Sequence, residues 1–360
     1  MGAVTSPYVL VKGMPVGPDG RIHTTYTQNP STLRFASHSP NLQNLPRANT
    51  PWGKMVKDIF IAPPGYTFYA ADFSGIEAVL VGYFAGLPDY IRLAKLDVHS
   101  FYTAHALHLI DGRVSTEDLP DLSWDDTQLK ACLGEIKRRF KNQRNSVFKH
   151  LIHAANYMQG PSGAQKTLFR LGGINESVKN VTRLMDIYFE LFPGIRQWHK
   201  DLCDRVDGAR RRRKDDPSET IDDPWTLGVA YAQNPFGYVH RFYHVLEWTK
   251  IGSEWISDFG EDANRLIAFL PQSTAAGIIK LAMRTIWEDY PELGDTLRLT
   301  IHDELLGEDR IETAEESLTL LMSIMSRPIP ELPLDPGWGM GECLSIGVEG
   351  KIGRIWSEMH

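Results

Sequence analysis

The chain has 360 residues, of which 42% are hydrophobic, so it can bury a substantial core in one large or two modest domains. Its formal net charge is −7, which excludes a uniformly basic nucleic-acid-binding protein. A chain of this composition that binds nucleic acid has to gather its positive charge on one face.

The three cysteines, Cys132, Cys203 and Cys343, are odd in number and far apart. They predict reduced thiols in a cytosol-like compartment and argue against a disulfide frame or a zinc cluster. No apolar run of about 18 residues is apparent, so we expect no membrane span. The N-terminal residues lack the basic start and apolar stretch of a signal peptide. We therefore expect a cytoplasmic protein.

The first strong signal follows residues 1–50, which are expected to form short strands and ordered loops. A strand-like stretch from Tyr66 to Ala71 ends on Asp72, and a helical pattern begins with Ile76 and Glu77. An acid at the tip of a buried strand is costly to desolvate unless a cation or hydrogen bonds compensate it. Alone, this pattern is also typical of a strand–turn–helix with a capping Asp.

Helical periodicity continues over 76–112, with a break at Gly86–Pro88, and over 125–158, which carries a dense basic face. In the second region Lys149, His153 and Tyr157 are spaced at i, i+4 and i+8, so they share one helix face. This face is suited to hold a triphosphate and stack on a base. A solvated Lys above a partly buried Tyr is the alternative.

The remaining elements follow in chain order. We expect a helix at 176–207, a loop at 208–224, strand-like pieces at 225–257, a helix at 261–289, a hairpin at 297–308, a helix at 312–326 and a terminal strand. The loop is basic and then acidic, which is typical of a solvated surface loop, although phosphate contact is an alternative.

The hairpin carries the second acid, because His302 and Asp303 separate two short strand-like runs. Together with Asp72 it supplies the parts of a two-metal site, in which two ions about 3.5–4 Å apart clamp the attacking and leaving oxygens. A further polar block, residues 34–47, carries side chains suited to base edges and sugars, or else to satisfying its own backbone.

In this order, the blocks resemble the polymerase part of family A DNA polymerases. The resemblance runs through GRIHTTYTQ, RFASHSPNLQNLP, ADFSGIE, LDVHSFYTA, KHLIHAANY, PQSTAAGIIK and IHDE, and so covers about residues 20–360. It implies an α+β right-hand fold, with an antiparallel palm sheet formed by 1–78 and 230–360. A helical fingers subdomain, 79–229, is inserted between these two segments.

The resemblance implies a template-directed DNA polymerase that adds dNTPs to a primer 3′-hydroxyl with two Mg²⁺ ions, for which Mn²⁺ substitutes. Asp72, Asp303 and the Phe73 carbonyl would hold the metals, with Glu304 as a supporting acid. The implied nucleotide-binding residues are Glu77 as steric gate, His99, Arg144, Lys149, His153 and Tyr157. The implied primer–template contacts are Arg34, Asn41, Gln43, Asn44, Gln272 and His302.

One departure concerns the register of the nucleotide-binding helix. The family carries an Arg four residues before the helix Lys, but here that position is Asn145 and the Arg is Arg144. On a continuous α-helix one residue rotates a side chain by about 100°. We interpret Asn145 or Ser146 as a helix cap, with Arg144 just outside the helix and still able to reach the triphosphate.

Only about 20 residues precede the first matching block, too few for a thumb subdomain or a proofreading nuclease. We therefore expect a second polypeptide that supplies the thumb, a nuclease or both, or else an engineered truncation. Two other functions stay open. A single-subunit RNA polymerase is disfavoured by Glu77 and Glu304, and a degenerate, non-catalytic DNA-binding subunit by the retention of Asp72 and Asp303.

Overall fold

The computed structural model describes residues 14–46, 51–215, 230–252 and 254–359. The structural statements below concern these residues.

Contacts between residues divide the chain into two compact units. The first, here called the sheet unit, comprises Met1–Ile76 and Gln272–His360, and the second, the helical unit, comprises Glu77–Pro271. The inserted arrangement expected from the sequence is therefore present, and its first boundary lies close to the predicted one.

The second boundary differs from the prediction. Residues 230–271, expected in the palm, group with the helical unit. The physical reason is local packing, because the first strands of this segment contact the long helix that precedes them in the chain. The labels palm and fingers stay predictions for the two units.

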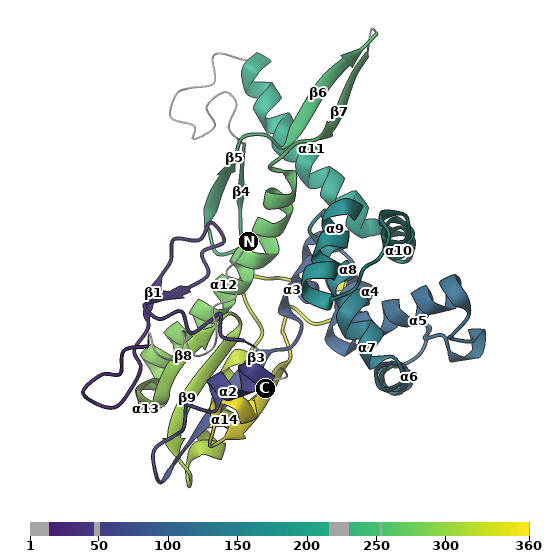
Figure 1. Cartoon of the computed structure of the whole chain (residues 1–360). Coiled ribbons are helices and arrows are strands. Elements are labelled where there is room, and N and C mark those ends of the chain that lie inside the picture. Colours follow the sequence, from purple (N-terminus) through teal and green to yellow (C-terminus); the bar gives the residue numbers. More distant parts are fainter. Residues whose placement is uncertain (1–13, 47–50, 216–229, 253, 360) are drawn as a thin grey trace. The chain divides into compact units, whose positions relative to one another are not determined.

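A four-stranded antiparallel sheet forms the centre of the sheet unit (Figure 1). Its order is β10-β3-β9-β8, so β3 lies between its two partners. Helix α14 packs against β3, β9 and β10 and covers one face of the sheet. The strands and this helix are β3 (Tyr66–Phe73), β8 (Leu297–Ile301), β9 (Glu304–Arg310), β10 (Val348–Gly353) and α14 (Ala314–Met325).

Tyr69 and Gly307 fix the register in the middle of this sheet, where they are paired. A Cβ on Gly307 would lie 2.2 Å from the Tyr69 ring, so only glycine lets the fully buried ring cross the neighbouring strand. The Tyr69 hydroxyl is hydrogen-bonded to the Thr296 hydroxyl. The other elements of this unit are β1 (Thr25–Thr27), β2 (Ala36–His38), α2 (Pro51–Lys57), α13 (Pro291–Thr296) and two 3₁₀ turns, Pro336–Trp338 and Trp356–Met359.

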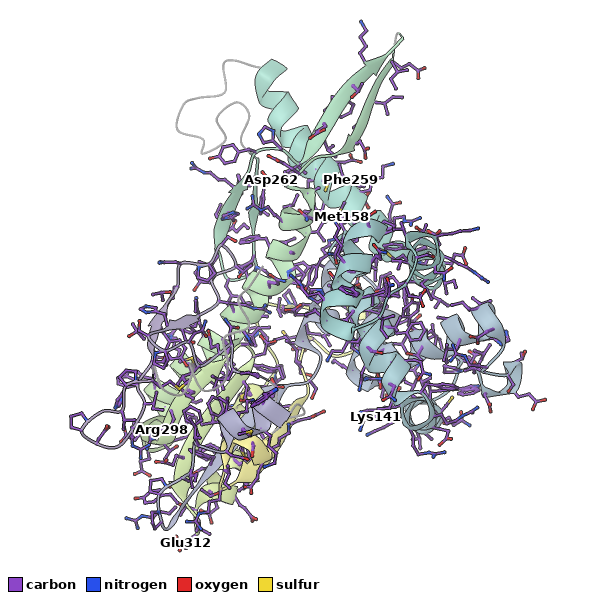
Figure 2. The ribbon with its side chains drawn as sticks, viewed as in Figure 1. Lys141, Met158, Phe259, Asp262, Arg298 and Glu312 are labelled. Carbon is purple, nitrogen blue, oxygen red and sulfur yellow. The ribbon has the colours of Figure 1, made fainter. Side chains whose placement is uncertain are left out.

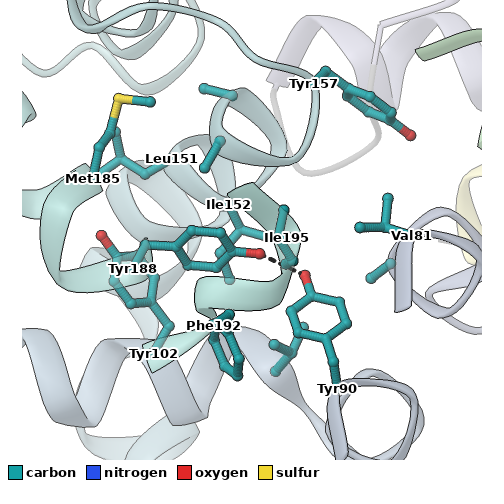
Figure 3. Close-up of a cluster of buried hydrophobic side chains, with 14 of the residues drawn as sticks. Val81, Tyr90, Tyr102, Leu151, Ile152, Tyr157, Met185, Tyr188, Phe192 and Ile195 are labelled. Atoms are coloured by element: carbon teal, nitrogen blue, oxygen red, sulfur yellow. Dashed lines mark hydrogen bonds between the residues drawn. The ribbon is translucent and has the colours of Figure 1, made fainter. Parts of the chain in front are cut away.

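The helical unit buries one large apolar core in which aromatic side chains are prominent. Tyr90, Tyr102, Tyr188 and Phe192 meet there in edge-on and tilted contacts, part of which Figure 3 shows. The helices that precede the hairpins in this unit are α3 (Ile76–Ala85), α4 (Pro88–Leu96), α5 (Val98–Asp111), α6 (Asp126–Arg139), α7 (Lys141–Gln143), α8 (Lys149–Asn156), α9 (Pro161–Thr167), α10 (Val178–Leu191) and α11 (Pro193–Asp215), with a 3₁₀ turn at Thr116–Asp118. Two π-helical turns, η2 (Arg144–Phe148) and η3 (Leu168–Gly172), interrupt this series.

Two hairpins follow α11, β4 (Ala230–Gln233) with β5 (Val239–Phe242) and β6 (Leu246–Ile251) with β7 (Glu254–Phe259). Asp262, labelled in Figure 2, ties them to the next helix. Its carboxylate accepts hydrogen bonds from the Tyr243 amide at 3.1 Å and from Arg265 at 3.0 Å.

The order of helices and strands agrees with the sequence prediction, including the hairpin at 297–308 and the terminal strand. The predicted helix at 176–207 is two helices, because Pro193 begins a new one. The predicted loop at 208–224 begins as the continuation of α11 to Asp215. Its remainder up to residue 224 lies outside the described residues.

Helix α12 (Ala263–Asp289) contradicts the expectation that the sequence contains no apolar run of about 18 residues. Among the described residues it is the one helix long and apolar enough to cross a membrane by length and composition. In the folded chain, however, 72% of its apolar stretch is buried. The core helix of a globular protein passes the same test, and this burial accounts for the apolar composition.

Candidate active site

Two strand ends of the sheet unit bring three acids together. Asp72 lies next to last in β3 and is paired in register with Glu304, the first residue of β9. The Phe73 amide donates a hydrogen bond to the Asp303 carbonyl at 3.3 Å, which ties the end of β3 to the turn before β9. The sheet register thus places the three predicted catalytic residues at one end of neighbouring strands, although about 230 residues separate them in the sequence.

A two-residue turn presents Asp303. Ile301 and Glu304 form the last pair of β8 and β9, so His302 and Asp303 alone connect the strands. His302 has φ 56°, in the left-handed region that tight hairpins require and that glycine usually fills. A non-glycine residue there costs about 1 kcal/mol or more. This strain is concentrated at the predicted metal-binding turn.

The acids repel one another in a partly desolvated setting. Burial and the Asp303 charge raise the pKa of Asp72 to about 6, although part of the Asp72 surface stays open to solvent. Burial and the Asp72 charge raise the pKa of Glu304 to about 7. Glu304 is 6% exposed, and its Oε1 atom has no hydrogen-bond partner among the described residues. A cation at this strand end would relieve both the repulsion and the unsatisfied oxygen.

The donor set suits a hard divalent cation, because carboxylate and carbonyl oxygens are the ligands that Mg²⁺ prefers. Within the described ranges no group of three or more His, Cys, Asp or Glu residues forms a ready-made metal cage. Mg²⁺ is typically held by one or two carboxylates, and water and phosphate complete its shell. The residues present therefore fit such an ion.

The predicted primer–template residues near the N-terminus occupy two different environments. Arg34 lies beside the acids, with its Nη2 atom 3.7 Å from Asp303 Oδ1, and Asn44 is exposed. Gln43 is buried, with Oε1 accepting from the Ser37 amide at 3.0 Å and Nε2 donating to the Thr300 carbonyl at 3.1 Å.

Asn41 also serves its own loop, since its Oδ1 accepts hydrogen bonds from the Ser37 hydroxyl and the Asn44 amide. The two hydrogen bonds of Gln43 hold its amide against the protein. Gln272 lies half-buried on α12. DNA contacts by these residues and by His302 stay predictions.

In the helical unit, the predicted stripe on α8 is in place around Glu77. The Tyr157 hydroxyl donates to Glu77 Oε2 at 2.6 Å, and His153 Nε2 lies 3.6 Å from the same oxygen. The His153 and Tyr157 rings meet edge-on at 4.7 Å. Lys149 is exposed at the start of this helix. The i, i+4 spacing thus brings a ring, an imidazole and a carboxylate together on one side of α8.

Arg144 is anchored by Asp97, which the sequence analysis missed. Asp97 ends α4, caps α5 through the Ser100 amide at 3.0 Å, and pairs with Arg144 Nη2 at 2.7 Å and Nε at 3.1 Å. His99 Nδ1 lies 3.7 Å from Asp97. The available signal was the acid two residues before His99 in LDVHSFYTA.

Asp97 and Arg144 stabilise each other's charge, whereas His99 is disfavoured as a cation. Burial alone would raise the pKa of Asp97, but hydrogen bonds from His99 and Arg144 outweigh it and hold that pKa well below its usual range. Burial lowers the pKa of His99, against the pull of Asp97. The nearby positive charges of Arg144 and Lys149 lower it further. The cluster thus pairs the Arg144 cation with one ionised carboxylate and keeps His99 beside both.

The helix-cap interpretation of Arg144 is wrong. Gln143, Arg144, Phe148 and Lys149 all have helical backbone angles, and the Ser146 hydroxyl donates back to the Asn142 carbonyl. The chain instead forms the π turn η2, in which the Lys149 amide donates to the Arg144 carbonyl five residues earlier. A π turn accommodates one extra residue within a helix, so Arg144 stays on the face of Lys149.

Gly172 allows this turn to pack. Turns η2 and η3 are in contact, and a Cβ on Gly172 would lie 2.3 Å from the Ser146 carbonyl oxygen. Only glycine lets the two backbones approach so closely. The register that leads into helix α8 therefore depends on a residue outside that helix.

Comparisons with known proteins agree with this geometry. The family model of DNA polymerase family A matches residues 7–118. The chain is 28% identical to DNA polymerase I of Chloroflexus aurantiacus, in a match that covers 94% of this chain. It is 26% identical to the thermostable DNA polymerase I of Thermus thermophilus, in a match that covers 90% of this chain. The chain is therefore similar to DNA polymerases of family A.

A solved polymerase structure supports the fold class. The polymerase domain of Pol1 from M. smegmatis, in complex with DNA primer-template and dNTP, matches with a TM-score of 0.62 and 25% identity. The match covers 97% of this chain and 50% of that one. The predicted α+β right-hand fold with an antiparallel sheet is confirmed. The chain spans about a third of the length of the two curated relatives, 29% and 32%.

Proposed function

We propose that this chain is a template-directed DNA polymerase that transfers nucleotidyl groups from dNTPs to a primer 3′-hydroxyl. The observation that carries the proposal is the register pair of Asp72 with Glu304, with Asp303 in the adjoining turn. Three acids that converge at one strand end have no structural need for one another, because burial and neighbouring carboxylates raise the pKa of both Asp72 and Glu304.

Asp72, Asp303 and the Phe73 carbonyl would hold two Mg²⁺ ions, or Mn²⁺ in their place. Bound there, the ions lower the pKa of the primer hydroxyl and neutralise charge on the triphosphate and the leaving pyrophosphate. Glu304 adds a buried carboxyl group paired in register with Asp72, and Arg34 balances the charge of Asp303.

The helical unit supplies groups for the incoming nucleotide. Arg144, Lys149 and His99 offer positive charge and hydrogen-bond donors for the triphosphate. Glu77, held by the Tyr157 hydroxyl, offers a fixed carboxylate where a ribose 2′-hydroxyl would need room. This pair favours a DNA polymerase over the single-subunit RNA polymerase alternative.

Primer extension with Mg²⁺ tests the proposal directly. Asp72→Asn and Asp303→Asn should each lower the extension rate at least about 100-fold, because each removes a group that acts mainly in the transition state. DNA affinity should change little, since neither residue donates to phosphate. Glu349→Gln is the matched control. Glu349 is exposed and pairs with Asp72 from the opposite strand β10, so its loss should leave extension within about threefold.

Normal extension by either Asp variant would remove that residue from the reaction. Equal losses in the Asp variants and in the Glu349 control would show that only the net charge of the strand end matters. Absence of extension by the unaltered chain, with DNA binding retained, would favour the degenerate DNA-binding alternative.

We further infer that the chain is a cytoplasmic enzyme. We also infer that it works with a second polypeptide, which supplies a thumb, a nuclease or both. The widely spaced cysteines support the location. The net charge of −7 supports the partner, because it leaves little long-range attraction for a phosphate backbone. The isolated chain should therefore extend primers distributively and lose activity steeply as salt rises. Long, salt-tolerant synthesis by this chain alone would contradict the need for a partner.

A further inference from the structure

A buried polar network surrounds Asn156, the last residue of α8. Its Oδ1 accepts a hydrogen bond from the Tyr188 hydroxyl at 2.6 Å, and its Nδ2 donates to the Tyr90 hydroxyl at 3.1 Å. The two hydroxyls are themselves 2.8 Å apart, as the dashed line in Figure 3 shows. The Asn156 carbonyl accepts from His199 Nε2 at 2.9 Å.

The network is sealed from solvent and uncharged. The four residues are at most 4% exposed. Burial raises the pKa of Tyr90 to about 12 and lowers the pKa of His199 to about 4, so both stay neutral near pH 7. Water cannot replace a lost partner in such a setting, and an unsatisfied group there is costly. Three helices, α4, α10 and α11, thus hold one residue of α8.

The held residue is next to the site. Helix α8 ends at Asn156, and Tyr157, which bonds Glu77, follows directly. Met158, labelled in Figure 2, has φ 54°, a left-handed angle that a side chain adopts only at a cost. A strained backbone angle persists only where the surrounding contacts hold the chain in place. The hydrogen bonds to Asn156 hold the chain two residues before Met158.

We propose that the Asn156 network is a positioning device that aims the Tyr157 hydroxyl at Glu77 and so contributes to sugar discrimination. This inference rests on the proposed function. Tyr90, Tyr188 and His199 are positioning residues, because they touch neither nucleotide nor Glu77 and act through Asn156. The alternative is that the network stabilises the fold and does nothing else.

Tyr188→Phe tests the proposal, with Tyr102→Phe as the matched control. The Tyr102 hydroxyl is fully buried in the same core and donates to the Leu184 carbonyl at 2.7 Å, outside the Asn156 network. Both variants lose one buried hydroxyl and should lose similar thermal stability. Only Tyr188→Phe should raise the ratio of rNTP to dNTP incorporation, by about fivefold, the scale of one lost hydrogen bond. Tyr90→Phe should act in the same way, and it replaces Tyr188→Phe if that variant fails to fold.

A double variant separates positioning from general loosening. In a Tyr157→Phe background the hydroxyl that the network aims is gone, so adding Tyr188→Phe should change selectivity less than about twofold further. Additive effects, or equal effects of Tyr188→Phe and Tyr102→Phe, would overturn the proposal.

A readout without catalysis keeps this result separate from the proposed function. Hydrogen exchange of the amides of residues 153–160 should accelerate in Tyr188→Phe and stay unchanged in Tyr102→Phe. Unchanged exchange in Tyr188→Phe would overturn the proposal even if the chain extends primers. Accelerated exchange in a chain that extends no primer would support positioning of Tyr157 and count against the polymerase function alone.

Discussion

Deleting Asn145 should leave nucleotide binding nearly intact, which is not what removal of a residue inside a helix usually does. The reason is the π turn η2, which already contains one residue more than an α-helical turn. The deletion converts η2 into an α turn and leaves Arg144 four residues before Lys149.

The size of the effect follows from helix geometry. In an α-helix, residues four apart are about 40° from alignment, whereas residues five apart are about 140° from alignment. The π turn absorbs the difference, so native and deletion variants both keep Arg144 on the face of Lys149. Adding an Ala after Asn145 instead rotates Arg144 by about 100° relative to Lys149. This rotation should remove the proposed contact of Arg144 with the triphosphate. The loss of one charge-assisted hydrogen bond is worth about 1.5–3 kcal/mol, or roughly a 10- to 150-fold higher KM.

The assay is steady-state dNTP incorporation by the deletion, the insertion, Arg144→Ala and Asn145→Ala. The deletion and Asn145→Ala should stay within about threefold of the native KM. The insertion and Arg144→Ala should both raise the KM for dNTP by this large factor. A silent Arg144→Ala with a damaging Asn145→Ala would refute the register argument, as would a deletion as harmful as Arg144→Ala. Circular dichroism of each variant shows whether the helical unit is still folded.

Two other outcomes follow from the helical unit. Glu77→Ala should raise rNTP incorporation relative to dNTP by at least about tenfold, the scale of steric discrimination in a tight pocket, and unchanged selectivity would locate discrimination elsewhere. His199 has its pKa lowered to about 4 by burial, so the unfolded chain takes up a proton between about pH 6.5 and pH 4 that the folded chain does not. The free energy of unfolding should therefore fall by about 2 kcal/mol from pH 7 to pH 5 through this residue. Urea titrations should show a smaller fall in His199→Gln, and an equal fall would exclude His199 as the cause.

Much of the site was predictable because short-range patterns carry it. A strand that ends on Asp72 and a two-residue turn at His302 and Asp303 are local features, and strand periodicity with turn chemistry predicts them. The α8 stripe is local too, since Lys149, His153 and Tyr157 repeat every four residues. That Asp72 meets Asp303 was predicted from their shared chemistry, because two carboxylates at strand ends can ligate a common pair of cations.

The tertiary structure decided what depends on partners distant in sequence. Gln43 was predicted to contact DNA, and the structure buries its amide against the Ser37 amide and the Thr300 carbonyl, which also accepts a hydrogen bond from the Tyr26 hydroxyl. In the sequence, Arg144 is one residue away from the position that would share the helix face of Lys149. Only the π turn, packed against Gly172, returns Arg144 to that face. Likewise, nothing in the sequence around Asn156 indicates that tyrosines on two other helices share its amide. Local propensity acts over a few residues, whereas close packing and the satisfaction of buried polar groups are fixed only when distant segments meet.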